Sequence, residues 1–282
     1  MTITNADLKI KSAKLLQALR AGQVYGNLFN TDYIGEIKGI GSQLQINNVL
    51  GGTVKKYTKG QKLETETLTD GKIDFVIDQA DYFNLTVDAL EEAFGAGGYL
   101  NVATQETVAN MTEASEKFYA SHYTEIPIAN ITAGAVGTGY SISTPSKAYD
   151  LIIDMGETLD NNNVPNLGRW LVAPNWFYNM LKKDDRVNKS TAKGDEIVRT
   201  GEILEIDGMT IYKSNFVPNK SKGVEEKIIA GYAGSATRGD AIDSVEEYKH
   251  PDFFGSFAKG LHVYGAKIVR PTSMALAIVN KA

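Results

Sequence analysis

The side chains that could carry out catalysis are few, and their spacing brings none of them together as an active site. The three histidines, His122, His250 and His262, lie far apart in the sequence. The chain has no cysteine, which excludes disulfide bonds, thiolate nucleophiles and cysteine-ligated zinc or iron–sulfur sites. We therefore expect no metal site, and we interpret each histidine as a packed or surface residue.

Paired carboxylates are the remaining candidates for acid–base chemistry. Asp150 and Asp154 are four residues apart with Glu157 nearby, so a helix would place them on one face. An exposed, charged helix face explains the same spacing without any chemistry. The sequence has no Gly-x-Ser-x-Gly nucleophile elbow, and the glycines of residues 134–139 lack the spacing of a phosphate-binding loop. We expect no catalytic residue and no cofactor.

Composition bounds the class of protein. A length of 282 residues is that of one large domain or two smaller ones, and 43% hydrophobic with 22% charged residues is ordinary for a globular protein. The net charge of −5 argues against a dedicated nucleic-acid binder, although a surface could face nucleic acid without gripping it. No apolar run is long enough to span a membrane, so we expect no membrane partner.

A long helix is predicted over residues 101–126, between a glycine break at residues 95–98 and Pro127, which cannot continue a helix. Such a helix is roughly 37 Å long and could serve as the spine of a domain. Its mostly apolar stripe comprises Ala103, Thr107, Val108, Met111, Ala114, Phe118 and His122. Its other faces are expected to carry Gln105, Glu106, Asn110, Glu113, Glu116 and Lys117.

Residues 44–88 have the alternation of extended strands, but the middle of this stretch has little to bury. Residues 51–71 are dominated by Thr, Lys, Gly and Glu, and their large apolar residues are Val54, Tyr57, Leu63 and Leu68. A structureless loop of this length would be unusual in a compact domain, so the pattern favours a projecting β-ribbon. Since an isolated ribbon is only marginally stable, we expect something outside its own fold to hold it.

Two further helices flank these elements. Residues 7–21 are predicted to form an amphipathic helix whose apolar face includes Leu15 and Leu19. This helix either packs on its own domain or lies on a neighbour as an arm, and the sequence favours neither alternative. A short helix is predicted over residues 86–94, directly before the spine helix.

The centre of the chain is predicted to be a mixed α/β unit. Thr144 and Pro145 are typical of a helix start, and the helix that follows would bury Ala148, Leu151, Ile152, Met155 and Leu159. Residues 169–173 and 227–232 are predicted strands, and Asp207-Gly208 indicates a tight hairpin turn. We expect the closing strand, residues 274–279, to return to the sheet of the domain that holds the spine helix.

Three segments resemble the major capsid proteins of tailed bacteriophages. The closing run Phe254-Gly-Ser-Phe-Ala-Lys-Gly-Leu-His-Val-Tyr-Gly-Ala-Lys-Ile-Val-Arg-Pro271 is similar to the last strands of that family. The segment Gly168-Arg-Trp-Leu-Val-Ala-Pro174 is similar to its strand-then-helix segment, and residues 201–218 to one of its hairpins. No single segment is decisive, but together with the ribbon and the spine helix they occur in the family's order over nearly the whole chain.

The resemblance implies an α+β, Hong Kong 97-like capsid fold. Its parts would be an N-terminal arm (1–30), an extended β-ribbon loop with its base (31–80), a peripheral domain with the spine helix (81–132 and 233–282) and an axial domain (133–232). The chain starts directly at the arm, without the helical prefix that some relatives use as a fused scaffold. A separate scaffolding protein is therefore implied.

The resemblance also implies a structural role without enzymatic activity: self-assembly into an icosahedral shell that encloses double-stranded phage DNA. Expected partners are copies of the chain in hexamers and pentamers, a scaffolding protein, a portal, a decoration protein and DNA contacted non-specifically. The location would be the virion, assembled in the host bacterial cytoplasm. Two alternatives stay open, an encapsulin-like compartment and a cytosolic α/β enzyme. The expected inter-subunit contacts are Val54, Lys56, Tyr57, Lys59, Leu63, Leu15 and Leu19.

Overall fold

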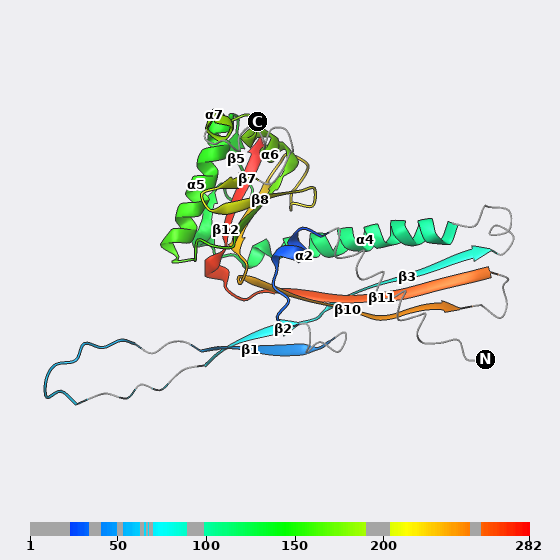
Figure 1. The fold of residues 1–282 in the computed structure, drawn as a ribbon, viewed down its shortest axis with the longest axis horizontal. Coiled ribbons are helices and arrows are strands. Elements are labelled where there is room, and N and C mark those ends of the chain that lie inside the picture. Colours follow the sequence, from blue (N-terminus) through cyan, green and yellow to red (C-terminus); the bar gives the residue numbers. More distant parts are fainter. Residues whose placement is uncertain are drawn as a thin grey trace.

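The computed structural model describes residues 23–33, 41–49, 53–62, 65, 67, 70–88, 99–189, 204–248 and 255–282. Within these ranges the chain has an α+β structure made of two packed parts and one projection (Figure 1). One part is a long three-stranded sheet beside a long helix, and the other is a seven-stranded sheet with shorter helices. The projection continues from a two-stranded ribbon at one end of the long sheet.

The long sheet is antiparallel, with the strand order β10–β11–β3. Its strands are β10 (Ala236–Tyr248), β11 (Gly255–Ile268) and β3 (Gln79–Asp88). Gly260 in β11 lies opposite Phe83 in β3, and a Cβ atom on Gly260 would come within 2.4 Å of that ring. The aromatic ring therefore occupies the space that the glycine leaves, which keeps this part of the sheet packed.

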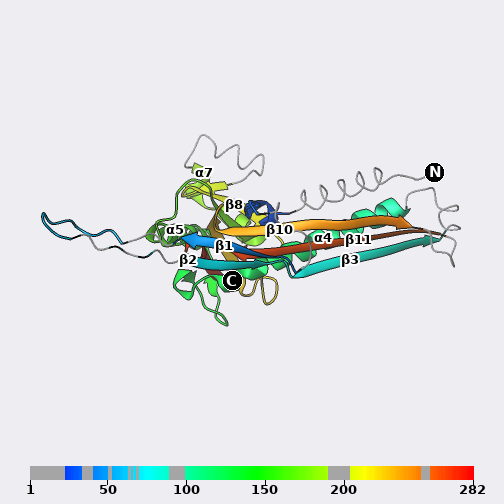
Figure 2. The same cartoon turned by 90° about the horizontal axis from the view of Figure 1, so that it is seen from below.

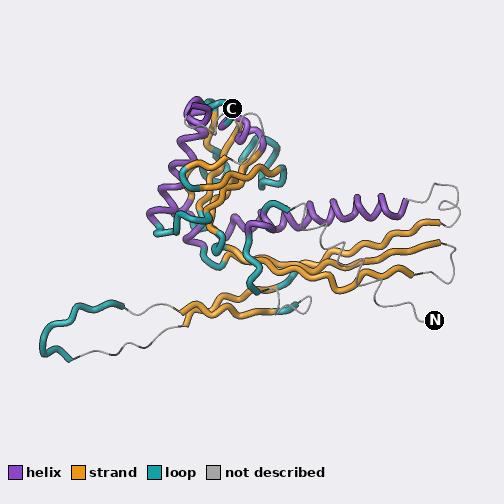
Figure 3. Tube along the Cα trace, in the orientation of Figure 1, coloured by secondary structure: helices purple, strands orange, loops and turns teal. Residues whose placement is uncertain are grey.

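The predicted spine helix is confirmed as α4 (Tyr99–Ser121), which a 3-10 turn extends over His122–Glu125. Figure 3 shows it running alongside the long sheet. Its buried face includes Met111 of the predicted apolar stripe but extends to residues that the stripe left out. Glu116, expected on an exposed face, has no exposed surface, and Ser115 next to it is equally buried. That expectation was wrong because the carboxylate of Glu116 has buried backbone partners, described below.

The seven-stranded sheet is mixed, and its strands are listed here in spatial order. They are β4 (Ile131–Ala133), β12 (Ala275–Lys281), β9 (Glu226–Tyr232), β6 (Arg169–Pro174), β8 (Met209–Ser214) and β7 (Leu204–Ile206), with β5 (Tyr140–Ile142) also pairing with β12. Both strands expected in this part, residues 169–173 and 227–232, are confirmed as β6 and β9.

One face of this sheet is covered by α5 (Pro145–Asn161) and α6 (Asn175–Leu181). The start of α5 is as predicted: the Thr144 side chain accepts a hydrogen bond from the Lys147 backbone N–H. All five residues predicted to be buried by this helix are buried, namely Ala148, Leu151, Ile152, Met155 and Leu159. A short α7 (Asp185–Lys189) follows.

The hairpin between β7 and β8 is also as predicted. Asp207 and Gly208 have φ angles of 52° and 69°, so both central residues adopt the left-handed conformation of a primed turn. The Asp207 carboxylate also fills space on α5: a Cβ atom on Gly156 would lie 2.1 Å from Asp207 Oδ2. The glycine therefore lets the turn approach the helix closely.

The closing strand lies in a different sheet from the one expected. β12 pairs antiparallel with β9 in the seven-stranded sheet, and not in the long sheet beside α4. Its alternate side chains Leu276 and Ile278 still reach the core beneath α4, where they pack with Tyr119 and Trp170. The strand therefore joins the two parts, with one face toward α5 and the other toward the spine helix.

The ribbon consists of β1 (Gln43–Val49) and β2 (Asp70–Val76), paired in register with Ile46 opposite Ile73. This confirms the paired base of the predicted ribbon. The helix predicted from residue 86 was wrong at its start, because residues 86–88 continue β3 and pair with β11. Residues 89–94 of that helix and residues 7–21 lie outside the described residues.

Candidate assembly surfaces

The projecting loop, residues 53–62, lies apart from the rest of the subunit (Figures 1 and 2). All ten of these residues are exposed, including Val54 at 98% and Tyr57 at 67% of their surface. The loop carries four lysines, Lys55, Lys56, Lys59 and Lys62, and no acidic residue. A valine and a tyrosine that gain little burial from their own subunit indicate that the loop finds its packing partners elsewhere.

The loop tip is a tight turn. The backbone N–H of Gln61 donates to the carbonyl of Thr58 at 3.0 Å, and Gly60 has a φ of 89°, which suits glycine. Lys59 lies inside this turn. Of the predicted contact residues, the structure places Val54, Lys56, Tyr57 and Lys59 on the exposed loop, while Leu63, Leu15 and Leu19 lie outside the described residues.

In contrast to the loop, the base of the ribbon is firmly packed. Ile46, Phe75 and Ile77 form a buried cluster with Val263 of β11. The ribbon backbone approaches β11 so closely that a Cβ atom on Gly265 would lie 2.8 Å from the Val76 carbonyl oxygen. The loop therefore projects from an anchored base.

The segment before the ribbon is held by the spine helix. The Glu116 carboxylate accepts hydrogen bonds from the backbone N–H groups of Val24 (2.8 Å), Tyr25 (3.1 Å) and Gly26 (3.2 Å). These groups form the start of α2 (Tyr25–Leu28). Burial raises the pKa of Glu116, and the three N–H donors and Arg238 oppose that shift. We call these three hydrogen bonds the Glu116 clamp. The clamp fixes the position of residues 24–26 against the spine helix.

A group of buried polar side chains lies between α4 and the long sheet. Arg238 Nη1 lies 3.0 Å from Asp240 Oδ2, and both side chains are almost fully buried. Beside them His262 stacks on Tyr264, whose hydroxyl donates to Asp81 at 2.8 Å. Burial lowers the pKa of His262, and neither ring nitrogen has a hydrogen-bond partner among the described residues. The buried site therefore favours the neutral form of this histidine.

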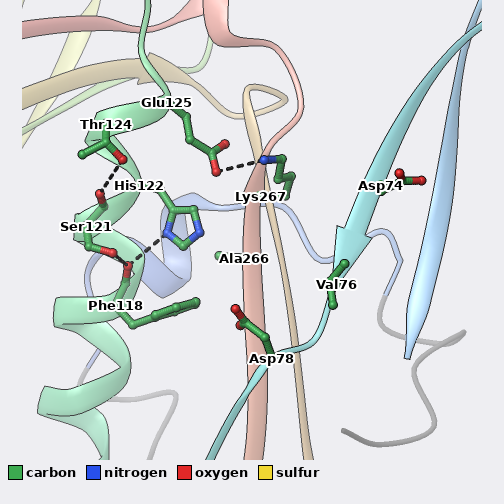
Figure 4. A pocket seen from close by; sticks show the side chains of 10 residues that line it. All are labelled: Asp74, Val76, Asp78, Phe118, Ser121, His122, Thr124, Glu125, Ala266 and Lys267. Atoms are coloured by element: carbon green, nitrogen blue, oxygen red, sulfur yellow. Dashed lines mark hydrogen bonds and ion pairs between the residues drawn. The ribbon is translucent and has the colours of Figure 1, made fainter. Parts of the chain in front are cut away.

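A cavity of about 290 Å³ opens where the end of α4 meets β11 and the base of the ribbon (Figure 4). Phe118, Val76 and Ala266 supply its apolar surface. Its polar lining comprises Asp74, Asp78, Ser121, His122, Thr124, Glu125 and Lys267. Glu125 is paired with Lys267 at 3.0 Å, and His122 Nδ1 lies 3.0 Å from the Phe118 carbonyl oxygen. Three separate segments of the chain form the cavity, so the sequence alone did not reveal it.

The candidates for acid–base chemistry are exposed residues of α5. Asp150 accepts a hydrogen bond from Arg186 Nη1 at 2.8 Å, and Arg186 also binds Asp184. Asp154 and Glu157 are exposed on the outer face of α5. In the part of the chain that the structure describes, no three His, Asp or Glu side chains are grouped as metal ligands. His250 lies outside that part.

None of the helices that the structure describes is both long and apolar enough to cross a membrane.

The fold is similar to solved structures, although no protein-family model and no curated protein matches the sequence. A structure from Mycobacterium phage Che8 is 27% identical, covers 90% of each chain and has a TM-score of 0.73. A capsid structure of the cyanophage P-SCSP1u is 17% identical over 93% of this chain and 88% of that one, with a TM-score of 0.71. A virus-like particle from Pyrococcus furiosus is 12% identical over 96% and 99%, with a TM-score of 0.56.

Proposed function

We propose that this chain, which has the Hong Kong 97-like fold of tailed-phage major capsid proteins, is a shell subunit that assembles with copies of itself into an icosahedral capsid. The observation that carries the proposal is the projecting loop, which exposes Val54 and Tyr57 far from the subunit's own core. A segment of this kind gains burial only in contact with another chain, so the subunit is completed by assembly.

Four residues of the loop are proposed to contact the neighbour: Val54 and Tyr57 by apolar burial, and Lys56 and Lys59 by charge. Leu63, which follows the loop in the sequence, and Leu15 and Leu19 of an N-terminal arm are proposed to add to these contacts. The Glu116 clamp supports the arm, because it fixes the exit of residues 1–22 at a defined place on the spine helix.

We keep the division into four parts as a proposal about the subunit. The arm comprises residues 1–30, the loop and its base 31–80, the peripheral domain 81–132 and 233–282, and the axial domain 133–232. The peripheral range ends in β12, which pairs with β9 of the axial sheet and so links the two domains. Loop and arm would then link peripheral domains, while axial domains meet at the centres of hexamers and pentamers.

The capsid would enclose double-stranded DNA, contacted without sequence specificity. The formal net charge of −5 supports this contact being weak, since few phosphate contacts release few counterions and leave the packed DNA free to slide. A separate scaffolding protein, a portal and a decoration protein are the further proposed partners. The place of the protein would be the virion, after assembly in the host bacterial cytoplasm, and its role structural without catalysis.

An encapsulin-like compartment is the second candidate, because the likeness to the Pyrococcus furiosus virus-like particle covers 96% of this chain. The two candidates differ in their contents. Particles purified from infected cells would contain nuclease-protected DNA if they are capsids, and a protein cargo if they are compartments. The higher TM-scores to the two phage structures favour the capsid.

Size-exclusion chromatography and electron microscopy of the purified protein test the proposal. A shell protein, co-expressed with its scaffold if it needs one, forms closed particles in the megadalton range. An enzyme with its site inside one subunit would elute as a monomer or small oligomer and show no shells, which would contradict the proposal.

A further inference from the structure

The cavity at the ribbon base combines an apolar floor with an acidic rim. Phe118, Val76 and Ala266 form the floor, while carboxylates approach from β2, the β2–β3 corner and the turn after α4 (Figure 4). Three carboxylates line it against one ammonium group, that of Lys267. This composition suits a long cationic side chain, whose aliphatic stem packs on apolar groups while its charged end meets acids.

Asp74 and Asp78 carry the negative charge that Lys267 does not neutralise. Glu125 is already paired with Lys267, and its second oxygen accepts from the Ile268 backbone N–H at 3.3 Å. Asp74 and Asp78 are exposed at the rim and form no ion pair with a residue that the structure describes. In Figure 4 the Asp78 side chain lies across the cavity from the His122 ring. Asp74 and Asp78 are therefore the carboxylates available to a cation that enters the cavity.

The chain itself supplies a segment of complementary charge. Residues 53–62 carry four lysines and no acid, and all of them are exposed. Lys59 lies inside the turn that Thr58 and Gln61 close. The loop extends away from the ribbon base that lines the cavity (Figures 1 and 2), so it does not reach the cavity of its own subunit. The matching loop therefore comes from another copy.

We propose that the cavity between β2, the end of α4 and β11 receives Lys59 from the loop of a neighbouring copy, with the ammonium group against Asp78 and Asp74. The proposal rests on the shell-subunit function and names the surface that accepts the loop. Because the loop and the cavity are different surfaces, the contact is heterologous: each copy gives its loop to one neighbour and accepts the loop of the other. Repetition of such a contact closes a ring when the rotation between successive copies adds up to a full turn, as in the proposed hexamers and pentamers.

Site-specific crosslinking tests the contact directly, and the absence of native cysteine gives it no background. The variant Lys59→Cys with Asp78→Cys is assembled and treated with a short bismaleimide linker. We expect a ladder of covalent multimers on a denaturing gel, because each copy is joined to two neighbours. The matched control, Lys59→Cys with Asp154→Cys, places the second thiol on the exposed face of α5 and gives no ladder.

Charge reversal provides the second measurement, which does not depend on thiol chemistry. Lys59→Glu alone and Asp78→Lys alone should each lower the yield of particles several-fold, and the effect should weaken in high salt. Combining the two restores the opposite charges and should recover most of the yield. Failure of the combination to exceed either single variant would overturn the proposal.

The outcomes separate this inference from the function on which it rests. If the unsubstituted protein forms no shells under any condition, the shell function itself fails. If shells form but the Lys59–Asp78 pair gives no more crosslinking than the Asp154 control, the cavity is not the acceptor while the shell function stands.

Discussion

Glu116, in the spine helix, accepts a hydrogen bond from the backbone of Tyr25, 91 residues earlier in the chain. The same carboxylate also binds the N–H groups of Val24 and Gly26, so one buried side chain satisfies the start of a short helix. The link ties the segment that precedes the loop to the rigid centre of the subunit. Sequence periodicity placed Glu116 on an outer face of the helix, whereas in the structure it is a buried anchor.

Glu116→Gln should destabilise the subunit by about 1–3 kcal/mol. The new amide NH₂ group cannot accept a hydrogen bond, so one backbone N–H that the carboxylate now binds would lose its acceptor. Thermal or urea unfolding of the unassembled subunit measures the loss. Glu113→Gln is the matched control on the same helix: Glu113 pairs with Lys117 at the surface, and its loss should cost no more than about 0.5 kcal/mol. Equal stability of the two variants would count against the clamp.

Acidification should destabilise the helix–sheet contact through His262. Burial is the main cause that lowers its pKa from 6.5; Asp240 and Asp81 act against the shift and Arg238 adds to it. Because the unfolded state then binds more protons, this contribution to stability is complete above pH 6.5 and is lost as the pH falls toward the lower, folded-state pKa.

His262→Phe keeps an aromatic ring beside Tyr264 without a titrating group. Its unfolding free energy should depend less on pH than that of the unsubstituted protein between about pH 5 and 7. Parallel unfolding curves across that range measure the difference. An unchanged slope in His262→Phe would refute the prediction.

The hairpin turn should not tolerate a β-branched residue at position 208. Gly208 has a φ of 69°, where a valine is strained, so Gly208→Val should cost upward of about 1 kcal/mol in unfolding free energy. Gly208→Asn is the matched control, since asparagine adopts this conformation more readily. If valine and asparagine gave the same stability as glycine, the primed turn would be wrong.

Local signals in the sequence were sufficient for the elements that are stabilised locally. Thr144 and Pro145 start α5 because a cap and a fixed φ act within one turn, and Asp207-Gly208 forms a hairpin because its φ angles are set by those two residues. The period of two in residues 44–46 and 73–77 likewise predicted the ribbon pairing.

Elements whose partners are distant were not predicted. Residues 86–88 extend β3 because residues 255–257 of β11 pair with them, and helical propensity at residues 86–94 gives no sign of that partner. The choice of β9 as the neighbour of β12 is equally non-local. Glu116 resembled any surface glutamate until the N–H groups of residues 24–26 were placed beside it. The cavity forms only where three segments that are distant in the sequence come together, so no local pattern indicates it.

The central claim is that the loop serves a neighbouring copy and contributes little to its own subunit. Deleting residues 53–69 leaves Leu50-Gly51-Gly52 to connect β1 with β2, and the buried base at Phe75 and Ile77 is untouched. The measurement is paired: unfolding of the unassembled subunit, and electron microscopy under assembly conditions. We predict a folded subunit whose stability changes by less than about 1 kcal/mol and which forms no shells. A subunit that unfolds, or normal shells without the loop, would contradict the account.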